Sequence, residues 1–175
     1  MISILIPCYN EKDTIEKIIE KINKLEHLKK EIIVIDDFSN DGTRKILKDK
    51  LENKVSKIIY NEKNSGKGFC IKKGIQVSSG DIILIQDADL EYDPKEYDKL
   101  IKPIIDGNAD VVYGSRFIGS EEKRILFFWH TIANKFLTLL SNMFTNLNLT
   151  DMETCYKVFK KEIINKVDLK EKGFG

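Results

Sequence analysis

Three carboxylate side chains alternate along a short segment that directly follows an apolar run. Asp87, Asp89 and Glu91 are separated by single residues, and the run before them covers residues 82–85. Carboxylates at alternate positions beyond a strand can converge on one cation, and oxygen ligands select hard ions such as Mg²⁺ or Mn²⁺. An EF-hand is a poor match, because Tyr92 occupies the position that a calcium loop reserves for glycine. We predict that these three carboxylates bind Mg²⁺ or Mn²⁺; the alternative is a solvated acidic turn.

Polar segments follow four further apolar runs of the chain. They cover residues 7–11, 36–43, 64–68 and 114–117. Because ligands of open α/β sheets bind beyond the carboxyl ends of the strands, we expect these segments to form one site. Asp37 is predicted to accept hydrogen bonds from a base or a ribose, whereas turn and helix-cap chemistry accounts for Asp41. Residues 64–68 (NSGKG) lack the spacing of a P-loop, and no GxGxxG follows the first run, so ATP hydrolysis and dinucleotide binding lose their support.

The elements that must position these segments are strands alternating with helices. Runs rich in Ile and Val at residues 2–6, 32–35, 55–60, 82–85 and 111–113 are continuously apolar, which is typical of strands buried on both faces of a parallel sheet. Helical spacing of apolar residues covers 14–28, 43–51, 67–77 and 94–105. This order predicts an α/β fold with a mostly parallel sheet flanked by helices.

Length and composition narrow the class of protein. The chain has 175 residues, of which 42% are hydrophobic, and its net charge is +1. One globular domain is expected, and neither disorder nor a strongly electrostatic nucleic-acid binder is favoured. The three cysteines are far apart and form no CxxC, so we expect no disulfide framework and no zinc site. These cysteines favour a reducing cytoplasm. The first apolar run lacks a basic leader and ends at a proline, which indicates a buried strand rather than a signal peptide.

An apolar and aromatic stretch at residues 125–149 departs from this alternation. Polar residues such as His130, Asn134 and Asn142 interrupt it, so a membrane-spanning helix is not expected. An amphipathic helical region at about 122–148 is predicted instead. Two interpretations are open: the apolar side packs on the sheet, or it meets lipid.

The motifs IPCYNE, VIDDFSNDGT, NSGKG, QDADLEYDP, YGSRF and LTDMETCYKVF, in this order, resemble those of family 2 glycosyltransferases with the GT-A fold. Within this family, the motifs are most similar to those of the dolichol-phosphate mannosyltransferase-like branch, which moves a sugar from a nucleotide donor to a polyprenyl phosphate. The resemblance implies one Rossmann-like GT-A domain over residues 1–175, with a donor-binding part at 1–118 and an acceptor and membrane-proximal part at 119–175. Relatives continue with further helices and often with membrane spans, so we expect this chain to lack C-terminal elements.

The resemblance also implies roles for individual residues. The donor would contact Pro7, Tyr9, Glu11, Ile35, Asp37, Asp87, Ala88 and Asp89. Asp89 matches a metal ligand, Glu91 stands where relatives often carry glutamine, and Asp87 is close enough to join them. Ser115 and Arg116 match a loop near the diphosphate and the acceptor phosphate, and Lys157 and Arg124 would add phosphate contacts.

The implied reaction is transfer from a UDP- or GDP-sugar with inversion at the anomeric carbon, at the cytoplasmic face of a membrane. A divalent cation would stabilise the charge of the leaving diphosphate. A phosphate acceptor is already an anion and needs positioning, whereas a saccharide hydroxyl would need a general base, for which Asp151 is the first candidate. Transfer to a saccharide hydroxyl and a non-catalytic nucleotide-sugar-binding module remain the alternatives. A sugar nucleotidyltransferase is disfavoured, because no Gly-rich basic loop follows the first strand.

Overall fold

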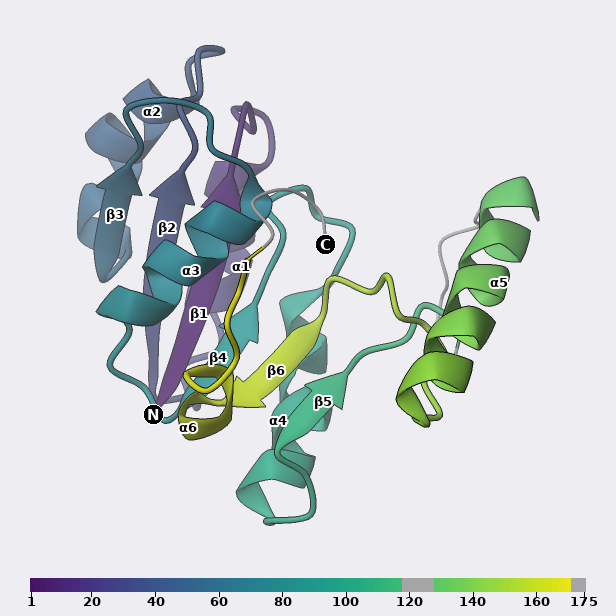
Figure 1. Cartoon of the computed structure of the whole chain (residues 1–175). Helices are drawn as coiled ribbons and strands as arrows, with labels where there is room; N and C mark the ends of the chain where they lie inside the picture. The colour runs from purple at the N-terminus through teal and green to yellow at the C-terminus, as the bar shows by residue number, and fades with distance from the viewer. Residues whose placement is uncertain (118–127, 171–175) are drawn as a thin grey trace.

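A six-stranded mixed sheet forms the centre of the protein (Figure 1). The computed structural model describes residues 1–117 and 128–170. The strands are β1 (Ile2–Cys8), β2 (Lys30–Asp36), β3 (Lys57–Tyr60), β4 (Ile82–Ile85), β5 (Val111–Tyr113) and β6 (Lys157–Lys160). Their spatial order is β3-β2-β1-β4-β6-β5. The first four pair in parallel, and β6 runs antiparallel to both β4 and β5.

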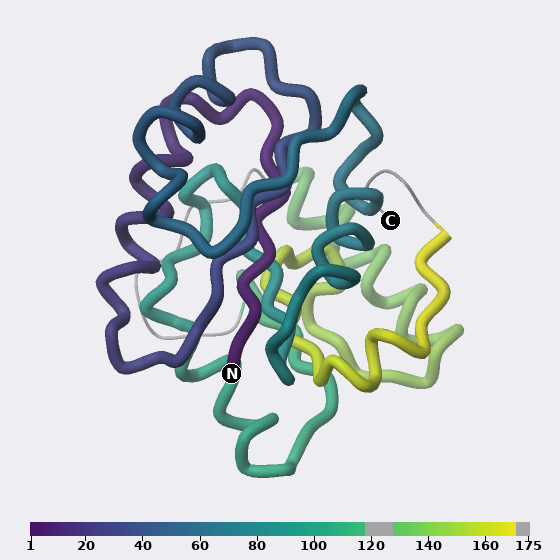
Figure 2. The backbone as a smooth tube through the Cα atoms, turned by 90° about the vertical axis from the view of Figure 1, so that its left-hand side faces the viewer, coloured from purple at the N-terminus to yellow at the C-terminus, as the bar shows by residue number. Residues whose placement is uncertain are grey.

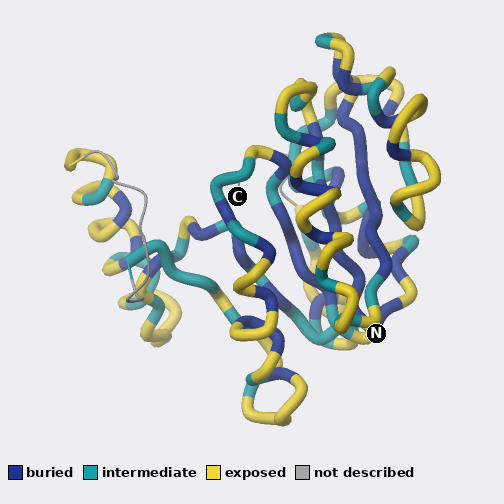
Figure 3. Tube along the Cα trace, turned by 180° about the vertical axis from the view of Figure 1, so that it is seen from behind, coloured by how far each residue is buried: buried dark blue, intermediate teal, exposed yellow. Residues whose placement is uncertain are grey.

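Both faces of the sheet are covered, which explains why the strand sequences are continuously apolar. Ile4 and Ile6 of β1 belong to one core cluster, whereas Leu5 between them belongs to the other. Residues that alternate along a strand point to opposite faces, so each face needs its own apolar set. Figure 2 shows the sheet between α1 and α2 on one side and α3 on the other, and Figure 3 shows its strands as mostly buried.

The helices follow the predicted alternation with shifted ends. They are α1 (Ile15–Asn23), α2 (Thr43–Ile46), α3 (Lys67–Val77), α4 (Tyr97–Ile105), α5 (Phe128–Thr145) and α6 (Lys161–Ile164), with the short turns η1 (Leu47–Leu51), η2 (Glu52–Lys54) and η3 (Pro94–Glu96). The first helix ends five residues before the predicted residue 28, although Leu25 and Leu28 still pack on the core. Asp93 caps η3 as its position before Pro94 suggests, since its carboxylate accepts the Lys95 N–H at 3.1 Å.

Helix α5 has an unusual orientation, because its polar side faces the protein. It stands apart from the sheet in Figure 1, and its buried residues are Asn134 and Thr138. Its large apolar side chains are exposed, including Trp129 (75%) and Phe144 (87%). The interpretation in which the apolar side of this helix packs on the sheet is therefore wrong. No helix in the described ranges 1–117 and 128–170 is long and apolar enough to cross a membrane.

Candidate functional site

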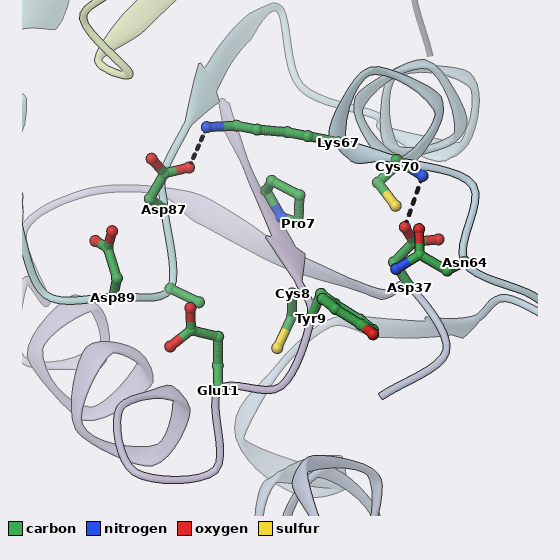
Figure 4. Close-up of a pocket in the computed structure, with 12 residues that line it drawn as sticks. Pro7, Cys8, Tyr9, Glu11, Asp37, Asn64, Lys67, Cys70, Asp87 and Asp89 are labelled. Atoms are coloured by element: carbon green, nitrogen blue, oxygen red, sulfur yellow. Dashed lines mark hydrogen bonds and ion pairs between the residues drawn. The ribbon is translucent and has the colours of Figure 1, made fainter. Parts of the chain in front are cut away.

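A pocket of about 310 Å³ opens at the carboxyl ends of β1, β2 and β4, beside the first turn of α3 (Figure 4). Its walls are formed by Pro7, Cys8, Tyr9, Glu11, Asp37, Asn64, Gly66, Lys67, Cys70, Asp87, Ala88 and Asp89. All of the residues predicted to contact the donor are in this wall except Ile35. That side chain is fully buried in the core beneath α3. The topology thus brings together residues that are up to 82 positions apart in the sequence, from Pro7 to Asp89.

Asp37 shapes one wall of the pocket. Its Oδ1 accepts the Asn61 amide at 2.8 Å and the Ser65 N–H at 2.9 Å, and its Oδ2 accepts the Gly66 N–H at 2.7 Å. Gly66 has a φ of +90°, a conformation that glycine adopts without the penalty of a Cβ. The carboxylate is therefore used to hold the loop that leads into α3, a role that we did not predict from the sequence.

Asp87 is paired with two side chains from other parts of the chain. Lys67 Nζ lies 2.5 Å from Oδ1, and the Cys155 thiol donates to Oδ2. Burial favours the neutral amine, but the charge of Asp87 and the contact with Cys155 outweigh it and raise the pKa of Lys67. Burial, followed by the charge of Asp87, raises the pKa of Cys155 to about 12, so this thiol stays protonated.

The carboxylates of the Asp87–Glu91 segment do not assemble into the predicted three-ligand cation site. Asp89 lines the pocket and accepts the Glu91 N–H at 3.0 Å, whereas Glu91 is not part of the pocket wall. Within residues 1–117 and 128–170, no three His, Cys, Asp or Glu side chains are grouped so that they could hold a metal. The carboxylates in the pocket wall still fit Mg²⁺ or Mn²⁺ in part, because Mg²⁺ is often held by one or two carboxylates together with substrate phosphates and water. Asp89 is the carboxylate that could serve in this way.

A buried polar network fixes the loop that carries Asp87 and Asp89. Gln86 is fully buried, and its Oε1 accepts the hydroxyls of Tyr97 at 2.8 Å and Tyr156 at 3.0 Å. Its Nε2 donates to the Asp87 carbonyl at 2.9 Å. A buried glutamine with all these contacts orients the loop more rigidly than an apolar residue would. The only sign of this role in the sequence is that a glutamine directly follows the apolar run of β4.

Arg116 and Asp151 form a bidentate ion pair next to α5. Arg116 donates from Nε to Oδ2 at 2.8 Å and from Nη2 to Oδ1 at 2.9 Å, and its backbone N–H adds a third bond at 3.1 Å. Asn134 of α5 donates to Oδ1 at 3.1 Å. Burial raises the pKa of Asp151, but the hydrogen bonds from Arg116 and Asn134 outweigh it and hold the pKa below its usual value. A carboxylate so engaged is a weak proton acceptor, so the geometry does not favour Asp151 as a general base.

The remaining residues predicted to contact phosphate are Lys157, Ser115 and Arg124, and none of them is part of the pocket wall. Lys157 of β6 is partly buried and rests 5.3 Å from the ring centre of Tyr113. Burial lowers its pKa, and the charges that act on it include Lys67, Asp87 and Asp151. Ser115 accepts the Phe117 N–H at 3.2 Å in a local turn. Arg124 lies outside the described residues.

A doubly covered, mostly parallel sheet with a carboxylate-lined pocket at its carboxyl edge defines an α/β protein of the GT-A type. Residues 3–168 match the glycosyl transferase family 2 profile. The chain belongs to this family.

Two of the curated proteins that the chain resembles are named as sugar transferases. It is 28% identical over 176 residues to a dolichol-phosphate mannosyltransferase of Pyrococcus furiosus, covering 99% of this chain and 50% of the relative. It is also 28% identical to an undecaprenyl-phosphate 4-deoxy-4-formamido-L-arabinose transferase of Proteus mirabilis, covering 94% and 50%. The chain therefore spans about half the length of these relatives.

The fold is shared with a glucosyl-3-phosphoglycerate synthase of Mycobacterium tuberculosis. That structure, solved with Mn²⁺, UDP and glucosyl-3-phosphoglycerate, superposes with a TM-score of 0.71 at 21% identity. The match covers 95% of this chain and 59% of the synthase. This agreement confirms the GT-A fold predicted from the sequence.

Proposed function

We propose that this domain transfers a sugar from a nucleotide sugar to the phosphate of a polyprenyl phosphate, with the help of Mg²⁺ or Mn²⁺. The observation that carries the proposal is the pocket, because the predicted donor loops meet in its wall. The curated relatives support the acceptor, since their names specify dolichol phosphate and undecaprenyl phosphate. The pocket is the donor site in this proposal.

The charges around the pocket explain why a divalent cation would be needed. Four carboxylates, Glu11, Asp37, Asp87 and Asp89, line it, against the single ammonium of Lys67 among the described lining residues. Such a wall repels a diphosphate unless a cation lies between them. Asp89 would hold that cation together with diphosphate oxygens, and the bound cation would act as a Lewis acid on the leaving group.

Lys157 is the residue that we assign to the acceptor phosphate. No ion pair joins this partly buried ammonium to a carboxylate within the described ranges, and its Nζ lies 5.3 Å from the centre of the Tyr113 ring. An ammonium removed from water without a counter-ion is stabilised by an incoming anion. Arg116 would support the same phosphate, although two of its nitrogens already hold Asp151. A phosphate anion can attack the anomeric carbon directly, so no proton acceptor is required.

The exposed side of α5 is suited to the membrane in which a polyprenyl phosphate resides. Its outward side chains include Phe128, Trp129, Phe136, Met143 and Phe144. Its inward side is tied to the acceptor region, because Asn134 contacts Asp151 and the Thr138 hydroxyl accepts the Met152 N–H at 3.2 Å. A helix that rests in the lipid interface would thus bring the acceptor phosphate close to Arg116 and Lys157.

Transfer to a saccharide hydroxyl is the second candidate function. The surroundings of Asp151, the first candidate for its general base, do not support it. That reaction needs a group that accepts a proton, and Asp151 already accepts four hydrogen bonds from Arg116 and Asn134. A non-catalytic nucleotide-sugar binder is distinguished from both candidates by the absence of turnover with any acceptor.

A thermal-shift screen tests the donor assignment directly. UDP- and GDP-sugars would be added to the 175-residue chain with and without Mn²⁺. A ligand present at 100 times its dissociation constant stabilises a protein by about 2.7 kcal/mol, or roughly 5–11 °C for a domain of this size. We expect one nucleotide class to stabilise the chain with Mn²⁺ and to have little effect without it. No stabilisation by any nucleotide sugar would contradict the proposed donor site.

A further inference from the structure

Both oxygens of Asp87 are occupied in the pocket by groups other than a cation. Figure 4 shows the side chain of Lys67 extending from α3 to Asp87, with Nζ 2.5 Å from Oδ1. The thiol of Cys155 holds Oδ2, and Lys67 Nζ also lies 2.6 Å from its sulfur. The side chains of Lys67 and Asp87 are only 16% and 18% exposed. A cation that approached Asp87 would therefore have to displace a partly buried ammonium.

Asp89 is the other carboxylate of this segment in the pocket wall, and alone it is a poor cation site. Its Oδ1 accepts the Glu91 N–H at 3.0 Å. The described ranges contain no group of three metal-ligating side chains. A single carboxylate competes weakly with water for Mg²⁺ or Mn²⁺, whereas a diphosphate adds several charged oxygens to the coordination shell.

We propose that Lys67, by occupying Asp87, keeps the divalent cation out of the pocket until a nucleoside diphosphate arrives. The inference rests on the proposed function, since it concerns the cation and the donor of that site. Before the donor binds, the ammonium repels a divalent ion and takes the place of one ligand. When the diphosphate arrives, it attracts the ammonium and supplies oxygens to the cation. Cation and donor then bind cooperatively, and by linkage each raises the affinity of the other by the same factor.

Direct measurement of Mn²⁺ binding tests this role without relying on turnover. Free Mn²⁺ would be followed by electron paramagnetic resonance during titration of the protein alone, with UDP and with GDP. We expect the wild-type chain to bind Mn²⁺ at least about tenfold more tightly with the nucleotide that fits, because a diphosphate adds charged ligands. Lys67→Met should bind Mn²⁺ without nucleotide at least about tenfold more tightly than wild type, because a neighbouring positive charge is lost and Asp87 becomes a ligand.

Three further variants separate this role from general effects of charge or folding. Lys72→Met removes the same charge from the same helix, where Lys72 contacts the Leu169 carbonyl, and should leave Mn²⁺ binding unchanged. Adding Asp87→Asn to Lys67→Met should cancel the gain. Lys67→Gln keeps a hydrogen-bond donor beside Asp87 while removing the charge, so it provides the same test if the methionine variant does not fold.

The possible outcomes distinguish the inference from the proposed function. If a nucleotide strengthens Mn²⁺ binding to wild type but neither Lys67 variant gains affinity in its absence, only the inference fails. Wild-type binding that is equal with and without nucleotide overturns the cooperative role. If neither UDP nor GDP promotes Mn²⁺ binding to any variant, the proposed donor site is wrong and the inference fails with it.

Discussion

Replacing Asp151 by asparagine separates its two possible roles. The carboxylate is buried and accepts two side-chain hydrogen bonds from Arg116, one from the Arg116 backbone and one from Asn134. Asparagine has nearly the same shape, but its NH₂ group replaces one of the two oxygens that accept hydrogen bonds from Arg116 and Asn134. If Asp151 positions Arg116 and α5, the substitution should destabilise the fold. If it is a general base, the loss should be confined to turnover.

The structure sets the size of the expected destabilisation. Removing one partner of a buried ion pair costs roughly 3–5 kcal/mol. The side chain of Arg116 is 23% exposed, so water screens part of its charge and the lower end applies. We expect a loss of about 3 kcal/mol in the free energy of unfolding at pH 7. At roughly 2–4 °C per kcal/mol for a domain of this size, the melting temperature should fall by about 6–12 °C.

The dependence of this loss on pH has a definite sign. The pKa of Asp151 is lower in the folded chain than its ordinary value of 3.8. Its contribution to stability is therefore fully present above that value and disappears as the pH falls through the lower folded pKa. The difference in stability between wild type and Asp151→Asn should be constant near neutral pH and should shrink below about pH 4.

Urea unfolding at several pH values, together with turnover, provides the assay. We expect the stability loss described above and an unchanged shape of the pH profile of kcat. A variant that melts within about 1 °C of wild type but has lost turnover would refute the positioning role and restore Asp151 as the base.

Substitutions on α5 and at the amino-terminal edge of the sheet should affect lipid binding and stability, respectively. Trp129→Ser combined with Phe144→Ser should weaken binding to anionic lipid vesicles at least tenfold in flotation assays, because each aromatic side chain contributes about 1.5–3 kcal/mol when fully buried. The control Ile105→Ser removes an apolar side chain that is 67% exposed at the end of α4 and should have no effect; equal loss in the control would contradict a lipid-binding role of α5. Gly80→Ala should destabilise the fold by about 1–3 kcal/mol in urea, because its Cβ would lie 2.6 Å from Ser3 Oγ. An unchanged urea midpoint for Gly80→Ala would contradict this prediction, because it would mean that the backbone around residue 80 moves to accommodate the Cβ.

The hydrophobic pattern predicted most of the sheet, because strands buried on both faces have continuously apolar sequences. The runs at residues 2–6, 32–35 and 82–85 became the central strands β1, β2 and β4. Strand β6 was missed because its four residues, Lys157–Lys160, begin and end with lysine and form no long apolar run. The orientation of α5 could not be predicted either. Periodicity identifies a helix with one polar and one apolar side, but it does not say which side faces the protein.

The pocket wall could be predicted from loop positions, whereas the pairing within it could not. Parallel strands bring their carboxyl ends to one edge, so Pro7, Asp37 and Asp89 had to lie near one another. The partners of Asp87 come from α3 and from the segment before β6, some 20 and 68 residues away. Side-chain pairing over such separations depends on packing that local sequence does not encode. For that reason the sequence did not reveal that Lys67 and Cys155 contact Asp87, and the binding of a cation by Asp87, Asp89 and Glu91 stays a prediction.

We propose that this domain moves a sugar from a nucleotide to a lipid phosphate. The most direct test measures nucleoside diphosphate release from the donor identified by thermal shift, with Mn²⁺, in the presence of polyprenyl phosphate in vesicles. We predict release that requires donor, cation and lipid phosphate together and that yields a glycosyl phospholipid. Release that is supported equally well by a saccharide acceptor, or no release under any of these conditions, would contradict the claim.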